Sequence, residues 1–297
     1  MTAPAIRVTG LHKTYKKTQA RRGLDFEVPA GQVTGFLGPN GAGKTTTFRA
    51  LLGLTRPQAG EIEILGMASP ARLNEITKKV GVIVEEPGLI KPLSGTVNLQ
   101  VAAETLGFGH SRIPEMLEFV GLTADSGRRV EEYSKGMRQR LALAAAMLGN
   151  PELLLLDEPL DGLDPAGQHV FKERLRALAD EGRTVVVSSH DLADIEALAD
   201  YVVVISHGRL VTQGSLESML DSGGTRVTVS DPDSAMNVLV AAGLTCQRDG
   251  QAVIVDSQDG STITRVLATA GMYPSEIRPE RSSLASEFLG MTGDPEL

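Results

Sequence analysis

Tryptophan is absent from the sequence, cysteine occurs once, and aromatic residues make up only 4% of the 297 residues. The single Cys246 rules out an internal disulfide and favours a reducing compartment. No apolar run approaches the roughly 18 residues of a membrane-spanning helix. The opening MTAPAIRVTG contains no basic segment followed by an apolar stretch, so we expect no secretion signal.

Positive charge is also scarce. The chain carries 29 Lys and Arg against 37 Asp and Glu, a net charge of −8, and it has no basic run. An acidic chain with few aromatic rings lacks both the electrostatic and the base-stacking surface that nucleic acid requires, so we expect no nucleic-acid partner. The 41% of hydrophobic residues suffices for a sizeable core, in one large domain or two unequal ones.

Short aliphatic runs predict an α/β fold with a parallel sheet. These runs cover residues 33–38, 78–84, 152–159, 184–191 and 201–208. Continuous apolar strands of this kind are typical of a sheet that is covered on both faces. Residues 4–9, 24–28 and 60–66 are further strand candidates, and 88–150 has the apolar spacing of helices.

A new pattern begins after DSGGT at 221–225, which we interpret as a linker. Strand and helix patterns then follow in the order βαββαβ, with a hairpin that turns at Asp249–Gly250. This order is typical of a small α+β domain of the ferredoxin-like type. We expect a first domain over 1–220, with a helical subdomain at 88–150, and an accessory domain over 221–297.

The segment GPNGAGKT, from Gly38 to Thr45, fits the phosphate-binding pattern G-x-x-x-x-G-K-[ST] and lies between a strand and a helix pattern. Its glycines let backbone N–H groups approach a β-phosphate. Lys44 would reach the β- and γ-phosphates, and the Thr45 hydroxyl would bind Mg²⁺. A plain glycine-rich turn is the alternative, which the strand–loop–helix context disfavours. The candidate nucleotide-binding residues here are Gly38, Pro39, Asn40, Gly41, Ala42, Gly43, Lys44, Thr45 and Thr46.

Two carboxylates end the buried run Leu153–Pro159. Ligand sites of open α/β sheets lie at the carboxyl ends of the strands. There Asp157 would bind Mg²⁺, and Glu158 would be the base that polarises the attacking water. A pair of solvated loop acids is the alternative. His190 ends a further run and would reach a γ-phosphate, although a lone histidine is more often a local hydrogen-bonding residue.

A second helix start, YSKGMRQRLALAAAML from Tyr133 to Leu148, also has the features of an anion site. It begins with a hydroxyl, a lysine and a glycine ahead of an apolar helix pattern. Ser134 would equally be a good N-cap of an ordinary helix, which is the simpler alternative. Tyr15, in KTYKK, would either stack on adenine or be an exposed loop residue.

The ordered set of these motifs resembles an ABC transporter ATP-binding subunit over residues 4–220. The set comprises Gly38–Thr45, Tyr133–Gln139, Leu153–Pro159, Leu163–Asp164 and His190. The resemblance implies a P-loop NTPase core with an antiparallel β subdomain and a helical signature subdomain. It also implies an ATPase that uses ATP and Mg²⁺.

In that family the signature segment binds ATP held by another subunit, so two copies enclose two ATP molecules. Ser134 and Gly136 match the signature's serine and second glycine, whereas Tyr133 replaces its leucine. Lys135 replaces the first glycine and would add positive charge beside the γ-phosphate of the facing copy. The resemblance also implies Asp164 as a residue of the nucleotide site.

Glu85 stands where the family usually has a glutamine that contacts Mg²⁺ and the attacking water. A carboxylate can also bind Mg²⁺, so the implied metal ligands are Thr45, Asp157 and Glu85. The extra charge would alter metal preference or turnover. The alternative is that neither Glu85 nor Glu86 touches the metal.

The loop EEPGL, the signature YSKGM and the additional C-terminal domain resemble the ATPase subunits of type-2 bacterial exporters, which serve drugs, antibiotics and bacteriocins. This resemblance implies an ATP-hydrolysing motor that pairs with a second copy or a homologous ATPase subunit and drives a separate integral membrane permease. It implies a cytoplasmic protein, peripheral on the inner face of the cell membrane, that serves drug, antibiotic or peptide efflux.

Two alternative functions remain. A non-transport ABC ATPase that acts on nucleic acid or ribosomes usually has long coiled coils or two ATPase modules, and neither is found in this sequence. A P-loop kinase would lack the segment Tyr133–Gln139 and the hydrolytic glutamate.

Overall fold

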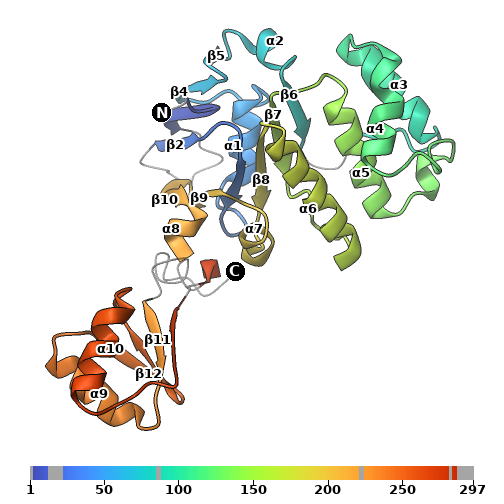
Figure 1. Ribbon diagram of the computed structural model, residues 1–297. Helices are drawn as coiled ribbons and strands as arrows, with labels where there is room; N and C mark the ends of the chain where they lie inside the picture. The colour runs from blue at the N-terminus through green and yellow to red at the C-terminus, as the bar shows by residue number, and fades with distance from the viewer. Residues whose placement is uncertain (1–2, 13–22, 85–87, 221–223, 281–282, 286–297) are drawn as a thin grey trace. The chain divides into compact units, whose positions relative to one another are not determined.

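The computed structural model describes residues 3–12, 23–84, 88–220, 224–280 and 283–285. These residues form two compact units, one up to Gly214 and one from Ser215 onward (Figure 1). No helix within the described ranges has both the length and the apolar character needed to cross a bilayer.

A six-stranded sheet organises the first unit. Its strands are β3 (Val33–Leu37), β6 (Val80–Ile83), β7 (Leu153–Asp157), β8 (Thr184–Ser189), β9 (Tyr201–Ser206) and β10 (Arg209–Ser215). They lie in the order β10-β9-β3-β8-β7-β6, and the run from β9 to β6 is parallel throughout. Every residue of β3 and β7 is buried, which explains their continuous apolar runs and confirms the predicted parallel sheet.

Helices cover this sheet. α1 (Lys44–Leu51) packs against β7, α6 (Pro165–Asp180) against β3 and β8, and α7 (Leu192–Glu196) against β8. The ring centroid of Phe36 in β3 lies 5.3 Å from that of Phe26 and 5.6 Å from that of Phe48 in α1. Phe26 belongs to a second sheet, so these three buried rings join both sheets and α1 in one core.

The second sheet is antiparallel and has the strand order β2-β1-β4-β5. Its strands are β1 (Ile6–His12), β2 (Leu24–Val28), β4 (Ala59–Ile64) and β5 (Met67–Ser69). Alternate residues of β2 are buried, as expected for a sheet that packs with one face. The strands predicted near 4–9, 24–28 and 60–66 are therefore confirmed.

The helical region predicted over 88–150 is also found. It contains α3 (Gly95–Leu106), α4 (Ile113–Phe119) and α5 (Lys135–Met147), which pack against one another and lie side by side in Figure 1. The short segments η1 (His110–Arg112) and η2 (Val130–Glu132) lie in the same region. The short helix α2 (Leu73–Ile76) precedes it. The Ser94 hydroxyl caps α3 by accepting from the N–H of Val97, and Gly107, with φ of 75°, ends it.

Asn98 fixes the loop that precedes α3. Its buried side chain accepts a hydrogen bond from the N–H of Ile90 at 2.7 Å. Its amide nitrogen donates to the carbonyl oxygens of Ile90, Leu93 and Ser94 at 3.1, 3.3 and 2.9 Å. One side chain thus holds the backbone of the segment that leads into the helical region.

The second unit contains the predicted βαββαβ order. Its elements are β11 (Thr225–Thr228), α9 (Pro232–Ala241), β12 (Cys246–Asp249), β13 (Ala252–Val255), α10 (Gly260–Thr269) and β14 (Glu276–Pro279), preceded by α8 (Leu216–Leu220). The sheet order is β12-β13-β11-β14, and all three pairings are antiparallel. Gly250, with φ of 60°, lies in the turn between β12 and β13, as the hairpin prediction required.

Asn98→Leu tests the loop anchor, because leucine keeps the side-chain size but removes every hydrogen bond. We expect the Ile90 amide to exchange with deuterium about 2- to 10-fold faster, since a net hydrogen bond contributes on the order of 1 kcal/mol. Hydrogen exchange read by mass spectrometry on the peptide around residues 88–95 measures this. Asn74→Leu, at an exposed position of α2, is the matched control and should leave that peptide unchanged. Equal exchange in both variants would contradict the anchor.

Candidate nucleotide-binding site

The loop between β3 and α1 has the backbone shape that phosphate binding needs. Gly41 and Gly43 have φ of 82° and 108°, values that other residues rarely adopt. A Cβ atom added at Gly38 would lie 2.3 Å from the carbonyl oxygen of Ile205, so only glycine fits there. One added at Gly41 would meet nothing within 4 Å, so this side of the loop is open. The first N–H groups of α1 therefore follow a loop that a phosphate can approach.

Lys44 is buried at the start of α1 and closes this loop. Its Nζ donates to the carbonyl oxygen of Gly38 at 2.7 Å and lies 3.2 Å from Oε1 of Glu158. An ammonium has three donors, so this arrangement keeps capacity for phosphate oxygens. By contrast, the Thr47 hydroxyl donates to the carbonyl oxygen of Gly43 at 2.9 Å and is used within the helix.

Asp157 ends β7 with its carboxylate buried. The hydroxyl of Ser188 on the neighbouring strand donates to Oδ1 of Asp157 at 2.5 Å, and the same hydroxyl oxygen accepts from the N–H of Glu158 at 2.9 Å. The parallel register pairs Asp157 with Ser188 directly. Ser188 therefore holds the Asp157 carboxylate and the backbone of Glu158. The sequence patterns gave no sign of this role, because nothing local distinguishes Ser188 from Ser189.

Glu158 connects the candidate catalytic groups. Its Oε1 lies 3.2 Å from Lys44 Nζ and its Oε2 lies 3.0 Å from Nδ1 of His190. A carboxylate oxygen accepts hydrogen bonds, so this contact is a hydrogen bond in the tautomer with the proton on Nδ1. The backbone φ of Glu158 is +47°, a left-handed value that is uncommon for glutamate and that clusters at functional sites. The structure thus brings Lys44, Glu158 and His190 together.

The donor set suits magnesium. Mg²⁺ is usually held by one or two carboxylates and substrate phosphates while it retains several waters. Thr45 and Asp157 offer a hydroxyl and a carboxylate oxygen of this kind. In the described part of the chain, no group of three or more His, Cys, Asp or Glu is arranged to hold a metal ion. A cation here would therefore depend on Thr45, Asp157 and the nucleotide phosphates together.

The start of α5 has a helix N-cap and also the exposure that an anion site needs. The Ser134 hydroxyl accepts from the N–H of Met137 at 3.1 Å, so it does cap the helix. Ser134 and Lys135 are nevertheless exposed, and their hydrogen bonds and ion pairs in the described chain do not reach the Gly38–Thr45 loop. Ser134 and Lys135 therefore lie at the surface, Lys135 beside Asp161, where a ligand from outside their own chain can approach them.

Tyr133, at the start of this segment, is accommodated by burial and a hydrogen bond. The ring is buried, and its hydroxyl donates to the carbonyl oxygen of Asp125 at 2.8 Å. Burial raises the pKa of the Tyr133 hydroxyl. A Cβ atom added at Gly95 would lie 2.4 Å from that hydroxyl, so Gly95 leaves the room that the larger side chain needs.

Other predicted residues fall into three groups. Asp164 is the N-cap of α6, where its carboxylate accepts from the N–H of Gly167 at 3.0 Å, and it is exposed. Pro39, Thr45 and Thr46 are half-buried in the loop and the first turn of α1. Tyr15 and Glu85 lie outside the described residues, so their roles stay predictions.

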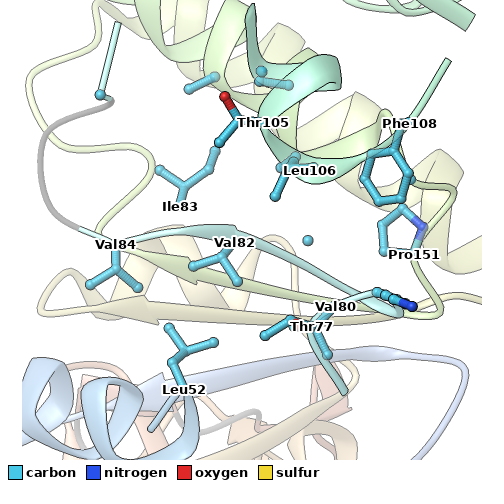
Figure 2. Close-up of a pocket in the computed structure, with 18 of the residues that line it drawn as sticks. Leu52, Thr77, Val80, Val82, Ile83, Val84, Thr105, Leu106, Phe108 and Pro151 are labelled. Atoms are coloured by element: carbon cyan, nitrogen blue, oxygen red, sulfur yellow. The ribbon is translucent and has the colours of Figure 1, made fainter. Parts of the chain in front are cut away.

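An apolar groove of about 480 Å³ runs between β6 and the helices α3 and α5. Figure 2 shows Leu106 of α3 opposite Val82 of β6 across it. Four of its hydrophobic residues are unusually exposed, namely Val82 at 36%, Ile90 at 43%, Val101 at 37% and Leu106 at 53%. Val84 and Gly88 both line the groove, so it borders the chain on either side of residues 85–87.

A glycine-rich loop between a parallel strand and a helix, with a buried lysine and two acids at the end of β7, defines the class of P-loop nucleoside triphosphatases. A family model described as "ABC transporter" matches residues 21–161. Among solved structures, an ATP-binding subunit of an ABC transporter has a TM-score of 0.65 and 30% identity, with 72% of this chain and 91% of that chain covered.

Curated relatives agree with this match. The chain is 38% identical over 275 residues to an uncharacterized ABC transporter ATP-binding protein, YhcH, of Bacillus subtilis (strain 168), covering 91% of this chain and 90% of the relative. It is 36% identical over 307 residues to the daunorubicin/doxorubicin resistance ATP-binding protein DrrA of Streptomyces peucetius, covering 98% and 93%. The chain therefore belongs to the ABC transporter ATP-binding proteins, and the predicted family and ATPase class are confirmed.

Ser188→Ala tests how the two acids are held, because alanine leaves Asp157 and the Glu158 N–H without their partner. Residues that orient a metal ligand typically affect metal affinity by about 10- to 100-fold. We expect the Mg²⁺ concentration for half-maximal ATP hydrolysis to rise by at least tenfold. Ser189→Ala is the matched control, since the Ser189 hydroxyl bonds to the N–H of Asp191 instead. The same Mg²⁺ midpoint in both variants would exclude a special role for Ser188.

Proposed function

We propose that this chain is the ATP-hydrolysing motor of a type-2 bacterial exporter. It works as a pair with a second copy or a homologous ATPase subunit, and it drives a separate integral membrane permease from the cytoplasmic face of the membrane. The observation that carries this proposal is the contact series Lys44–Glu158–His190 beside the Gly38–Thr45 loop. A binding module without hydrolysis would have no need of a strained glutamate paired with a histidine at that point.

The roles of the residues follow from their chemistry. Backbone N–H groups of the loop and Lys44 bind the β- and γ-phosphates of ATP, and Thr45 and Asp157 hold Mg²⁺. When bound, Mg²⁺ neutralises phosphate charge. Glu158 accepts a proton from the attacking water, and His190, which contacts the same carboxylate, orients it and reaches the γ-phosphate. The remaining predicted roles, adenine stacking by Tyr15 and metal contact by Glu85, belong to the same proposal.

Pairing of two copies supplies the groups that one copy lacks. Ser134, Lys135 and Gly136 of one copy contact the γ-phosphate of ATP held by the other, and Asp164 belongs to the same interface. This is supported by the exposure of Ser134 and Lys135 and by the absence of any bond from them to the loop of their own chain, within the residues described. ATP then joins the two copies, and hydrolysis separates them.

The permease contact is assigned to the apolar groove along β6. Exposed apolar surface of this kind, rimmed by polar residues, marks interaction sites. We propose that its occupant is a short amphipathic helix whose aliphatic side chains contact Val82 and Leu106. The groove is lined by Val84 and Gly88, the described residues on either side of 85–87.

The second unit is proposed to be an accessory domain. Its βαββαβ order, with the strand order β12-β13-β11-β14, supports a ferredoxin-like type. We assign residues 1–220 to the nucleotide-binding domain and 221–297 to the accessory domain. The match to the drug-resistance protein DrrA covers 98% of this chain, and therefore both units, which favours drug or antibiotic efflux as the transport class.

Glu158→Gln tests the motor, because it removes the base and leaves Lys44, Thr45 and Asp157 to bind Mg-ATP. Loss of a general base typically lowers the rate by about 10²–10⁴-fold. The variant should therefore accumulate as an ATP-bound dimer, which sedimentation with ATP detects. Adding Ser134→Arg should separate this dimer, since a bulky side chain would then face the phosphate.

Glu152→Gln is the control for this experiment, because Glu152 precedes the same strand and pairs with the exposed Lys79. It should hydrolyse ATP normally. A Glu158→Gln dimer that survives Ser134→Arg would make the start of α5 an ordinary helix cap.

Leu106→Asp tests the groove by placing a charge where an apolar helix is expected. We expect the Leu106→Asp variant to bind less to washed membrane vesicles, prepared from cells that carry the native gene for this chain. Its ATP hydrolysis in solution should continue. Leu54→Asp is the matched control, since Leu54 is 70% exposed but does not line the groove. Equal retention of both variants would exclude the groove as the membrane-protein contact.

A further inference from the structure

Lys135 connects the start of α5 to the loop that follows Glu158. Its Nζ lies 3.4 Å from Oδ2 of Asp161, and both side chains are about half exposed or more. No other ion pair or side-chain hydrogen bond of Lys135 occurs among the described residues. Its ammonium is therefore held by a single carboxylate of its own chain.

Gly162 provides the path for this lysine. A Cβ atom added at Gly162 would lie 2.1 Å from Nζ and 3.0 Å from Cε of Lys135, so the lysine crosses directly over the glycine backbone. Gly162 also has φ of 62°, which disfavours any side chain there. The position of Lys135 is thus defined by the ion pair with Asp161 and by the packing of the lysine stem over Gly162.

This contact is easily exchanged. Exposed ion pairs contribute little to stability, because both charges are well solvated and both side chains lose rotamer freedom. A lysine ammonium is a mobile point charge on a flexible stem, and hydrogen bonds from it to phosphate are among the stronger ones. A triphosphate that reaches the start of α5 from outside will therefore compete successfully with Asp161.

We propose that Asp161 is a positioning residue that keeps Lys135 in an ion pair within its own chain and thereby weakens the pairing of two copies around ATP. This inference rests on the proposed function, in which Lys135 faces the γ-phosphate of the other copy. Pairing requires Lys135 to leave Asp161, so the aspartate raises the dissociation constant of the ATP-bound dimer. It would favour release of the two copies once the phosphate has been hydrolysed.

The test measures the dimer dissociation constant by sedimentation of the full chain carrying Glu158→Gln, at saturating Mg-ATP. Breaking one exposed ion pair corresponds to about a 1.4- to 5-fold change in an equilibrium constant. Because a two-fold symmetric dimer breaks two such pairs, Asp161→Asn should lower the dimer dissociation constant by about 2- to 25-fold. Lys135→Met keeps the stem over Gly162 but removes the charge, and it should weaken the dimer by at least tenfold. In the Lys135→Met background, Asp161→Asn should have no further effect.

The controls are Lys79→Met and Glu152→Gln, which break another exposed lysine–carboxylate pair and should leave the dimer unchanged. If Asp161→Asn still tightens the dimer when Lys135→Met is present, the inference is overturned, because the aspartate would then act by general charge repulsion. An unchanged or weaker Asp161→Asn dimer would also overturn it, while leaving the paired motor intact. A chain that stays monomeric with bound ATP in every variant would overturn both the pairing and this inference.

Discussion

The parallel register of β3, β8 and β7 is the constraint on which the site depends. Leu37 pairs with Ser189, and Asp157 pairs with Ser188, so the three strands end at one level of the sheet. The glycine-rich loop, the Asp157–Glu158 pair and His190 all leave from that edge. A slip of one residue would turn the Asp157 side chain to the other face of the sheet and separate it from Ser188. Burial of every residue in β3 and β7 prevents such a slip, because it would disturb apolar packing on both faces.

The polar groups at this edge satisfy one another. Lys44 and Asp157 are buried, and burial of a charge is unfavourable unless the charge is paired or hydrogen-bonded. Lys44 has Gly38 and Glu158 as partners, and Asp157 has Ser188. Glu158 keeps an uncommon backbone conformation because its N–H and both carboxylate oxygens are held from three sides. The edge is therefore preorganised to offer an ammonium to a phosphate and a buried carboxylate to a cation.

The helical region carries both the apolar groove and the exposed start of α5. Asn98 fixes the loop beside the groove, and Tyr133 anchors the start of α5 by filling the space beside Gly95. Lys135 then extends from that anchored start to Asp161 in the loop after Glu158. The groove and the start of α5 thus lie on one set of packed helices. In the proposed function, this packing would connect the membrane partner to the nucleotide site.

The sequence by itself determined the features that depend on local chemistry. The loop Gly38–Thr45 was recognisable because its turns need glycine, the Ser134 cap because hydroxyls bond to helix N–H groups, and the buried strands because their runs are continuously apolar. β5 and β10 escaped prediction, since β5 has three residues and β10 is only partly buried and mostly polar. Only the tertiary structure decided that Ser188 holds the Asp157 carboxylate and the Glu158 N–H, that Lys135 reaches Asp161 over Gly162, and that Val82 faces Leu106 across a groove. These pairs join residues that are far apart in the chain, and their distances are set by strand register and helix packing, which no local pattern encodes.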